Sequence, residues 1–184
     1  MSTSDRSAER RLPDGTVVRL RAVGYGDPVA HELVERVQQE YVVRYGGPDA
    51  AVVDAAEFVP PVGLFLVASV DGVPAGCGAW RVHGPGVAEV KRVYVEPRFR
   101  RLGLARLVVR ALEDGAAGAG HRAVVLNTGD RQPEALALYA ELGYRPVAGY
   151  GVYAGEAGAV FLGKDLPASG AAPGGAGEER TWAS

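Results

Sequence analysis

Apolar residues along the chain recur with two different spacings, and these spacings predict both strands and helices. Alternating apolar and polar residues at 16–23 predict a strand that is buried on one face. Val29, Leu33 and Val37 are four residues apart, which is typical of an amphipathic helix. A nearly continuous apolar run at 63–70 is typical of a strand that is buried on both faces.

The same patterns, together with the turn residues between them, give an order of elements for the rest of the chain. Proline at the first helical position and glycine after the last one mark helix ends. Strands are expected at 16–23, 63–70, 74–83, 87–95, 123–126, 145–148 and 159–164. Helices are expected at 28–45, at 49–58, from residue 99 or 100 into the glycine-rich 115–120, and at 132–142. This order predicts a mixed α/β sheet.

Composition agrees with one globular domain between two polar ends. The 184 residues are 47% hydrophobic and 23% charged. We expect a flexible N-terminus at 1–12, a domain at 13–166 and a disordered C-terminal tail at 167–184. No apolar run reaches the roughly 18 residues of a membrane span, and no Cys/His cluster has zinc-ligand spacing. These features predict a cytoplasmic protein that contains no metal and does not bind a membrane.

Positive charge is concentrated in one segment. The formal net charge of −2 argues against binding to nucleic acid. Seven of the 20 Lys and Arg residues nevertheless lie between Lys91 and Arg110, where Glu96 is the one acidic residue. A focused basic segment in an acidic protein indicates a small anionic ligand, and a solvated arginine-rich helix face is the alternative.

Within this segment, residues 100–105 (Arg-Arg-Leu-Gly-Leu-Ala) join a predicted strand to a predicted helix. The first turn of a helix has unpaired backbone N–H groups and the positive end of the helix dipole, and both attract phosphate. Gly103 lacks a Cβ, so an anion can approach the backbone closely. The turn is therefore expected to hold a diphosphate. The chain lacks the glycine-rich motifs of P-loop NTPases and of Rossmann dinucleotide sites.

Two blocks of sequence resemble the GCN5-related N-acetyltransferase (GNAT) family. Residues 100–105 match that family's [QR]-x-x-G-x-[GA] signature. Residues 132–139 (Gln-Pro-Glu-Ala-Leu-Ala-Leu-Tyr) and the later Leu142-Gly143-Tyr144 resemble its L-Y-x-x-x-G-[FY] ending. The two blocks occur in the family's order and separation, and the resemblance spans residues 16–166.

The resemblance implies a GNAT fold, with a mixed, mostly antiparallel central sheet of six to seven strands flanked by helices. It also implies acetyl-CoA as co-substrate, with the diphosphate on the amides of 101–105. The pantetheine arm would pair with 93–95, in a gap between the parallel strands 87–95 and 123–126. The implied cofactor-binding residues are Val93, Tyr94, Val95, Arg100, Arg101, Leu102, Gly103, Leu104, Ala105, Asn127 and Gln132.

For two of these residues, a role other than cofactor binding stays open. Gln132 stands where relatives commonly have asparagine, which leaves its role open. Asn127 orients substrate or cofactor, or else caps the turn formed by residues 128–130.

The resemblance also implies an acid and a base for aminolysis of a thioester. Tyr139 matches the family's general acid for the leaving thiolate, and a core aromatic residue is the alternative. Glu89, in an otherwise apolar strand, matches a glutamate that relatives use as base, often through water. The alternative for Glu89 is an ion pair with Lys91 or an arginine. Tyr41 and Trp80 line the acceptor pocket or pack in the core.

The sequence therefore predicts an acetyl-CoA-dependent N-acetyltransferase that acts by direct attack in a ternary complex. Its acceptor would be a primary amine of a small molecule or a peptide. A non-catalytic acyl-CoA-binding sensor is the alternative, and it would need neither Glu89 nor Tyr139. No motif in 29–61 or 148–158 identifies the acceptor, and a homodimer is one of the oligomeric states left open.

Overall fold

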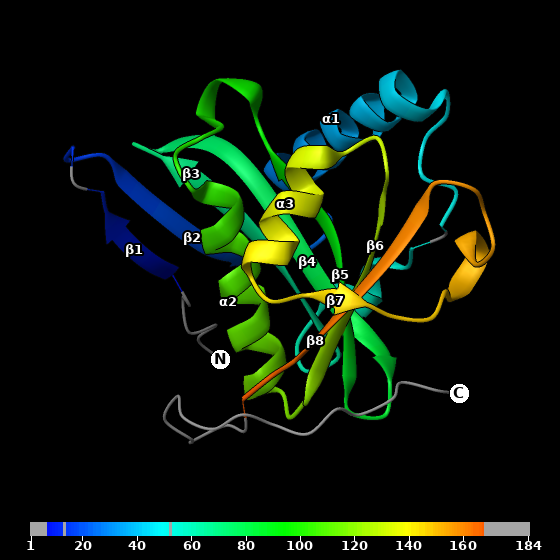
Figure 1. The fold of residues 1–184 in the computed structure, drawn as a ribbon. Helices are drawn as coiled ribbons and strands as arrows, with labels where there is room; N and C mark the ends of the chain where they lie inside the picture. The colour runs from blue at the N-terminus through cyan, green and yellow to red at the C-terminus, as the bar shows by residue number, and fades with distance from the viewer. Residues whose placement is uncertain (1–6, 13, 52, 168–184) are drawn as a thin grey trace.

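The computed structural model describes residues 7–12, 14–51 and 53–167, which form an eight-stranded sheet with helices on both faces (Figure 1). The strands lie in the order β1-β2-β3-β4-β5-β6-β8-β7, and β5–β6 is the parallel pair. The strands are β1 (Ser7–Arg11), β2 (Val17–Val23), β3 (Gly63–Val70), β4 (Val73–Gly84), β5 (Val87–Val95), β6 (Ala123–Gly129), β7 (Arg145–Pro146) and β8 (Ala159–Asp165). The helices are α1 (Pro28–Tyr45), α2 (Leu104–Gly118) and α3 (Pro133–Glu141), and 3-10 turns are η1 (Ala55–Phe58), η2 (Pro97–Phe99) and η3 (Gly151–Tyr153).

The predicted class, a mixed and mostly antiparallel sheet flanked by helices, is confirmed. The sheet has eight strands, whereas six to seven were expected. The added strand is β1, which pairs with β2 in the segment that was expected to be a flexible N-terminus. Residues 1–6 and 168–184 lie outside the described residues, so the expectations for the first residues and for the tail are not addressed.

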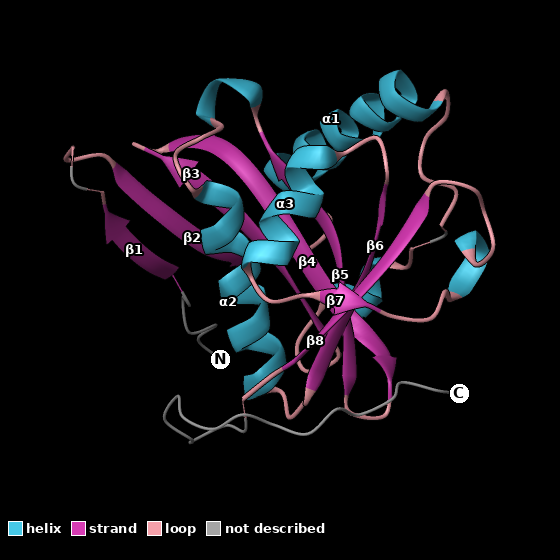
Figure 2. Ribbon diagram, in the orientation of Figure 1, coloured by secondary structure: helices cyan, strands magenta, loops and turns pink. Residues whose placement is uncertain are grey.

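Helices cover both faces of the sheet (Figure 2), and an apolar cluster lies under the helices on each face. Helices α2 and α3 pack on one face, where Val108, Leu112 and Leu142 contact Leu66, Trp80 and Val90 in one core cluster. Helix α1 and turn η1 pack on the other face, where Leu33, Val37 and Phe58 contact Phe65, Val67 and Cys77. Burial of these side chains supplies most of the stabilisation that holds the helices to the sheet.

Local sequence explains the ends of α1. The Asp27 side chain accepts hydrogen bonds from the amides of Val29 and Ala30, and Pro28 occupies the first helical position. Gly46 ends the helix with a φ of 83°. The helix expected at 49–58 is shorter: only the 3-10 turn η1 forms there, because Asp49 is held by partners far away in the sequence, described below.

A bulge in β5 changes which side chains share a face. The register between β4 and β5 shifts between Cys77, paired with Tyr94, and Ala79, paired with Lys91. Arg92, which has a φ of 58°, and Val93 together oppose the single residue Gly78, so β5 carries one extra residue here. Strict alternation would place Glu89 and Lys91 on one face with Val93 and Val95. The bulge instead puts Val93 against the α2 core with Val90.

Candidate functional site

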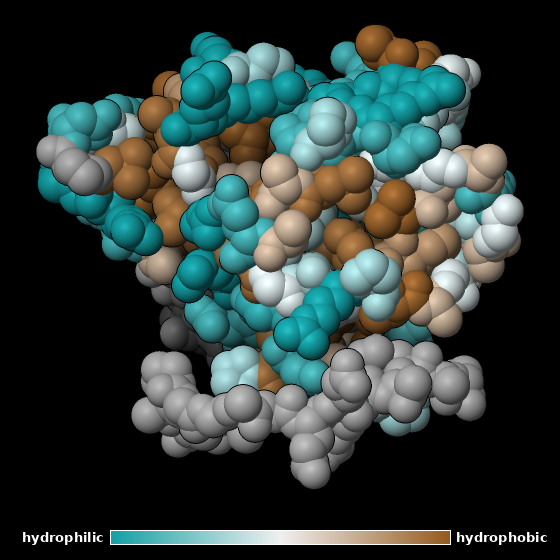
Figure 3. All heavy atoms as spheres, viewed as in Figure 1, coloured by the Kyte–Doolittle hydropathy of each residue, from teal (hydrophilic) through white to brown (hydrophobic). Residues whose placement is uncertain are grey.

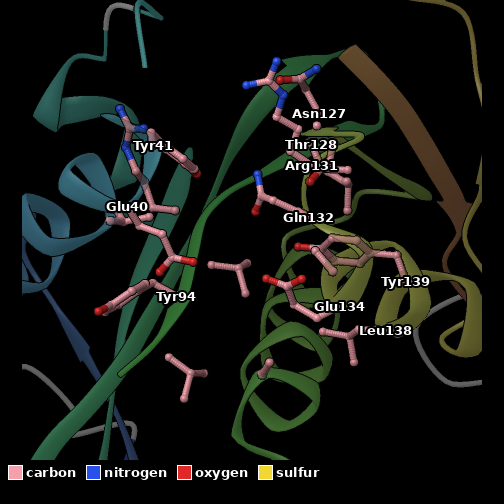
Figure 4. Close-up of a pocket in the computed structure, with 18 of the residues that line it drawn as sticks. Glu40, Tyr41, Tyr94, Asn127, Thr128, Arg131, Gln132, Glu134, Leu138 and Tyr139 are labelled. Carbon is pink, nitrogen blue, oxygen red and sulfur yellow. The ribbon is translucent and has the colours of Figure 1, made fainter. Parts of the chain in front are cut away.

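A cleft of about 1320 Å³ lies between β5 and β6 and is bounded by α1, by the start of α2 and by α3. Its outer surface carries polar side chains on both sides of a hollow with apolar atoms inside (Figure 3). The close-up shows Glu40 and Tyr41 on one wall, opposite Gln132, Glu134 and Tyr139 on the other (Figure 4). A cleft with an apolar interior and a few polar groups is typical of a small-molecule site.

The parallel strands separate inside this cleft. Pairing between β5 and β6 begins at Val87–Ala123 and ends at Val90–Leu126, although β5 continues to Val95 and β6 to Gly129. Among the described residues, the facing edges of the two strands beyond this point have no strand partner. The opening corresponds to the gap that the resemblance implied, and it leaves backbone groups of β5 available to an extended ligand.

The loop before α2 provides backbone amides at one end of the cleft. Arg101 and Gly103 have φ values of 69° and 78°, and Gly103 is the N-cap of α2 without a side-chain hydrogen bond. The first intrahelical bond runs from the Leu107 amide to the Gly103 carbonyl, so the earlier amides of α2 are not used by the helix. A Cβ at Gly103 would meet no atom within 4 Å. The loop thus fits an anion such as a diphosphate.

Tyr139 lies on α3 and lines the cleft. Its side chain is buried, and the close-up shows the hydroxyl on the cleft side of the ring (Figure 4). Burial, with a smaller contribution from Tyr41, raises the pKa of Tyr139 well above its ordinary value. A hydroxyl that keeps its proton at neutral pH can donate it to a basic leaving group.

Glu89 is buried in β5 but does not line the cleft. Its carboxylate accepts a hydrogen bond from Arg81 Nε at 2.8 Å and lies 3.4 Å from Lys91 Nζ. Arg81 also pairs with Glu57 at 2.7 Å, so the charges alternate along this group. These contacts favour the ion-pair alternative, and Lys91, which lines the cleft, separates Glu89 from it.

We expect Glu89→Gln to lower stability more than chemistry. The change leaves Lys91 and Arg81 with one fewer anionic partner in a buried setting, which should lower the unfolding free energy by about 1–3 kcal/mol. Urea unfolding and the pH dependence of turnover check this together. A fall in turnover of about 100-fold or more would instead assign Glu89 as the base.

The sequence interpretation missed a second polar group, at the far end of the cleft from the α2 loop. Arg92, buried in the β5 bulge, pairs with Asp49. Asp49 also accepts hydrogen bonds from the Tyr153 hydroxyl at 2.6 Å and from the Ala51 amide at 2.9 Å. These contacts tie the α1–η1 loop to η3, and Arg92, Asp49 and Tyr153 all line the cleft.

The ionisation of Asp49 should make this group pH-sensitive. Burial alone would raise the pKa of Asp49, but the Tyr153 and Ala51 hydrogen bonds and the Arg92 charge hold it below its ordinary 3.8. A depressed pKa stabilises the fold above the unfolded-state pKa and loses that effect as pH falls through the folded-state pKa.

We therefore expect Asp49→Asn to cost about 3 kcal/mol of unfolding free energy at pH 7, because Arg92 keeps a buried, unpaired charge. The difference from the parent protein should persist down to about pH 4 and shrink below it. Urea unfolding at pH 7 and near pH 3 measures both values. Glu35→Gln, at an exposed position of α1, is the control, and an equal loss in both variants would contradict the account.

The cleft brings together most of the residues that the sequence predicted. Tyr41 lines it, whereas Trp80 packs in the core under α2. Leu102 points away and is 37% exposed, and like Glu89 it does not line the cleft. Predicted residues that line it are Val93, Tyr94, Val95, Arg100, Arg101, Gly103, Leu104, Ala105, Asn127, Gln132 and Tyr139.

Asn127 and Gln132 have different surroundings. The Asn127 side-chain nitrogen is buried and has no hydrogen-bond partner among the described residues. A cap of the turn would use the side-chain oxygen, so both roles predicted for Asn127 stand. Gln132 donates from Nε2 to the Tyr45 hydroxyl at 3.0 Å. Its side chain therefore links α3 to α1 in this structure.

Asp49, Tyr153 and Glu40 were not singled out as site residues. Glu40 has the spacing of a solvated residue of the helix at 28–45. Asp49 is at the start of the helix that was expected at 49–58. Their roles depend on contacts with β5 and η3 that no local pattern encodes. Arg92 carried the one usable signal, because it is a charged residue, like Glu89 and Lys91, within a strand that is expected to be buried.

The described ranges contain no group of three or more His, Cys, Asp or Glu that could hold a metal ion. Within the same ranges, no helix is both long enough and apolar enough to cross a membrane.

Comparisons with known proteins agree with this geometry. The model of the acetyltransferase (GNAT) family matches residues 30–144. The chain is 31% identical over 136 residues to an IAA acetyltransferase of Azospirillum brasilense, which covers 73% of this chain and 89% of the relative. It is 35% identical over 98 residues to human N-acetylaspartate synthetase, covering 53% of this chain and 32% of that protein.

Solved structures support the same assignment at the level of the fold. The GNAT domain of S. lividans PAT superposes with a TM-score of 0.67 at 19% identity, covering 87% of this chain and 97% of that one. The family match includes most of the residues that line the cleft. The chain belongs to the GNAT family of acetyltransferases.

Proposed function

We propose that this protein transfers an acetyl group from acetyl-CoA to a primary amine of a small molecule or a peptide, by direct attack in a ternary complex. Residues 13–166 would form the transferase domain. The observation that carries the proposal is the separation of β5 from β6 after Val90, next to the unused amides at the start of α2. Similarity to a relative named N-acetylaspartate synthetase supports an amine nitrogen as the acceptor.

Each part of the cleft has one task in this proposal. Amides of residues 101–105 and the Arg100 and Arg101 side chains bind the diphosphate. The free edge of β5 at Val93–Val95 pairs with the amide groups of the pantetheine arm, and Asn127 faces the arm from β6. The thioester supplies an activated carbonyl carbon, to which the amine nitrogen adds as the carbon–sulfur bond breaks.

Protons must move in both directions during this transfer. Tyr139 donates its hydroxyl proton to the leaving thiolate, because its raised pKa keeps the proton in place beforehand. The attacking amine loses one proton. Glu89, the acceptor that the sequence predicted for that proton, is bound by Arg81 and Lys91 and does not line the cleft. We therefore give the proton to water and leave the role of Glu89 to the Glu89→Gln measurement.

The test is release of free coenzyme A in the presence of a panel of primary amines, after calorimetric measurement of coenzyme A binding. Binding together with amine-dependent release supports the enzyme. Binding without turnover across a broad panel of small amines and peptides would favour the non-catalytic sensor. Absence of binding would exclude both.

A further inference from the structure

Two carboxylates lie where the proposed function places a diphosphate. Glu40 of α1 and Glu134 of α3 both line the cleft near the α2 loop, and the close-up shows them on opposite walls (Figure 4). Burial would raise the pKa of Glu134, but a backbone hydrogen bond and the charges of Arg44 and Arg100 hold it below its ordinary value. Carboxylates beside an anion site repel the ligand unless cations neutralise them.

A chain of alternating charges neutralises both carboxylates and crosses the cleft. Arg100 donates to Glu40 Oε2 at 2.7 Å. The other oxygen of Glu40 accepts two hydrogen bonds from Arg44, from Nε at 3.0 Å and from an Nη at 2.8 Å. Arg44 in turn pairs with Glu134. The α2 loop is thus connected to α3 through two side chains of α1, Glu40 and Arg44.

Arg100 also donates a hydrogen bond to a backbone carbonyl of β5 that the proposed ligand would use. Its Nε donates to the Val95 carbonyl at 3.0 Å. Val95 is in the stretch of β5 that we assign to pairing with the pantetheine arm. In this structure Arg100 is therefore bound to Glu40 and to β5, so a phosphate competes with these two acceptors for its N–H groups.

At the other end of this series of charges, Arg44 connects α1 to the segment before α3, across the opening between β5 and β6. Arg44 donates to the Arg131 carbonyl at 2.8 Å, and Arg131 donates to the Arg44 carbonyl at 2.9 Å. Tyr45 lies so close to Gly129 that a Cβ there would be 2.0 Å from its hydroxyl oxygen. We call residues 44–45 with residues 129–134 the α1–α3 bridge.

We propose that Glu40 is a positioning residue that holds Arg100 in place of the diphosphate, so that coenzyme A binding releases Glu40 and loosens the α1–α3 bridge on the acceptor side. The inference rests on the proposed function, because it takes coenzyme A as the ligand. It gives α1 a role in coenzyme A binding in addition to the roles proposed for the α2 loop and for Tyr139.

The exchange follows from the charges. Arg44 is shared between Glu40 and Glu134. When the diphosphate pairs with Arg100, Glu40 keeps only its contacts with Arg44. Glu40 then competes more strongly with Glu134 for the N–H groups of Arg44, so the Arg44–Glu134 ion pair weakens. Ion pairs that are partly exposed contribute little individually, so a competing dianion is sufficient to rearrange them.

Calorimetric titration with coenzyme A tests the first half of the proposal. Glu40→Gln removes the competitor of the diphosphate and should tighten binding about three- to fivefold, the effect of losing one partly exposed ion pair. Glu32→Gln removes the same charge from α1 two turns away, where Glu32 pairs with Arg36, and should change binding less than twofold. In an Arg100→Gln background, Glu40→Gln should have no further effect.

Hydrogen exchange tests the second half. On addition of coenzyme A, amides of residues 42–46 and 129–134 should exchange faster, while the α2 loop becomes protected. In Glu40→Gln no carboxylate of α1 competes with Glu134 for Arg44, so these segments should exchange no faster than in the wild type without ligand, and coenzyme A should not speed their exchange.

The failures are distinguishable. Wild-type protein that does not bind coenzyme A would overturn the proposed function. Normal binding with equal affinity in Glu40→Gln, equal tightening in Glu32→Gln, or added protection of the α1–α3 bridge would overturn the role of Glu40 and leave the proposed function in place.

Discussion

Gly103→Glu should abolish binding of coenzyme A. The residue has a φ of 78°, a conformation that costs a side chain about 1–2 kcal/mol, and it lies at the start of α2. A carboxylate there would place a negative charge beside the amides that we assign to the diphosphate. We expect the dissociation constant to rise at least about 100-fold, which corresponds to roughly 2.7 kcal/mol.

Gly120→Glu is the matched control for this change. Gly120 follows the other end of α2, has a φ of 93°, and leaves open space for a Cβ. Its backbone strain and added charge are therefore similar, but it lies outside the cleft. Calorimetry should detect binding in Gly120→Glu and none in Gly103→Glu. Similar binding in the two variants would contradict the assignment of the α2 loop.

Tyr139→Phe should leave coenzyme A binding nearly unchanged and lower turnover by about 10²–10⁴, the usual contribution of a general acid. The ring, which packs in the core with α2, is retained. Because burial raises the pKa of the hydroxyl, wild-type turnover should not decline through its ionisation below about pH 10. Steady-state turnover across pH and calorimetric affinity measure the two effects separately.

Tyr144→Phe is the control for loss of a buried hydroxyl. Its ring lies edge-on to that of Tyr139, with centroids 5.3 Å apart, and its hydroxyl has no hydrogen-bond partner among the described residues. Tyr144 does not line the cleft, so its variant should retain turnover. Wild-type turnover in Tyr139→Phe, or an equal loss in Tyr144→Phe, would show that Tyr139 is not the acid.

Much of the fold could be predicted because local patterns and tertiary contacts agree. The apolar run of β3, the capped start of α1 and the limits of β5 were placed within a residue. β1 was missed because its residues are polar, and it is a strand through pairing with β2. A helix was expected at 49–58, but Asp49 is instead held by Arg92 and Tyr153, which are far from it in the sequence.

The site divides in the same way. The sequence predicted the α2 loop and Tyr139 as site residues because each lies in a contiguous motif. An ion pair of Glu89 with Lys91 or an arginine was one of the two alternatives, but the sequence could not identify Arg81 as the arginine, because Arg81 approaches from β4. The bulge at Arg92 depends on the register with the same strand. The spacing of Glu40 and Arg44 is that of solvated residues on a helix. Their ion pairs with Arg100 and Glu134 form only because the fold brings these elements together.

Calorimetric titration of the wild-type chain with coenzyme A tests the central claim, that the opening between β5 and β6 and the start of α2 together form a binding site for the acyl carrier. The account predicts saturable heat with one site per chain and no such heat for Gly103→Glu. Absence of saturable heat from the wild-type chain at millimolar coenzyme A would contradict it.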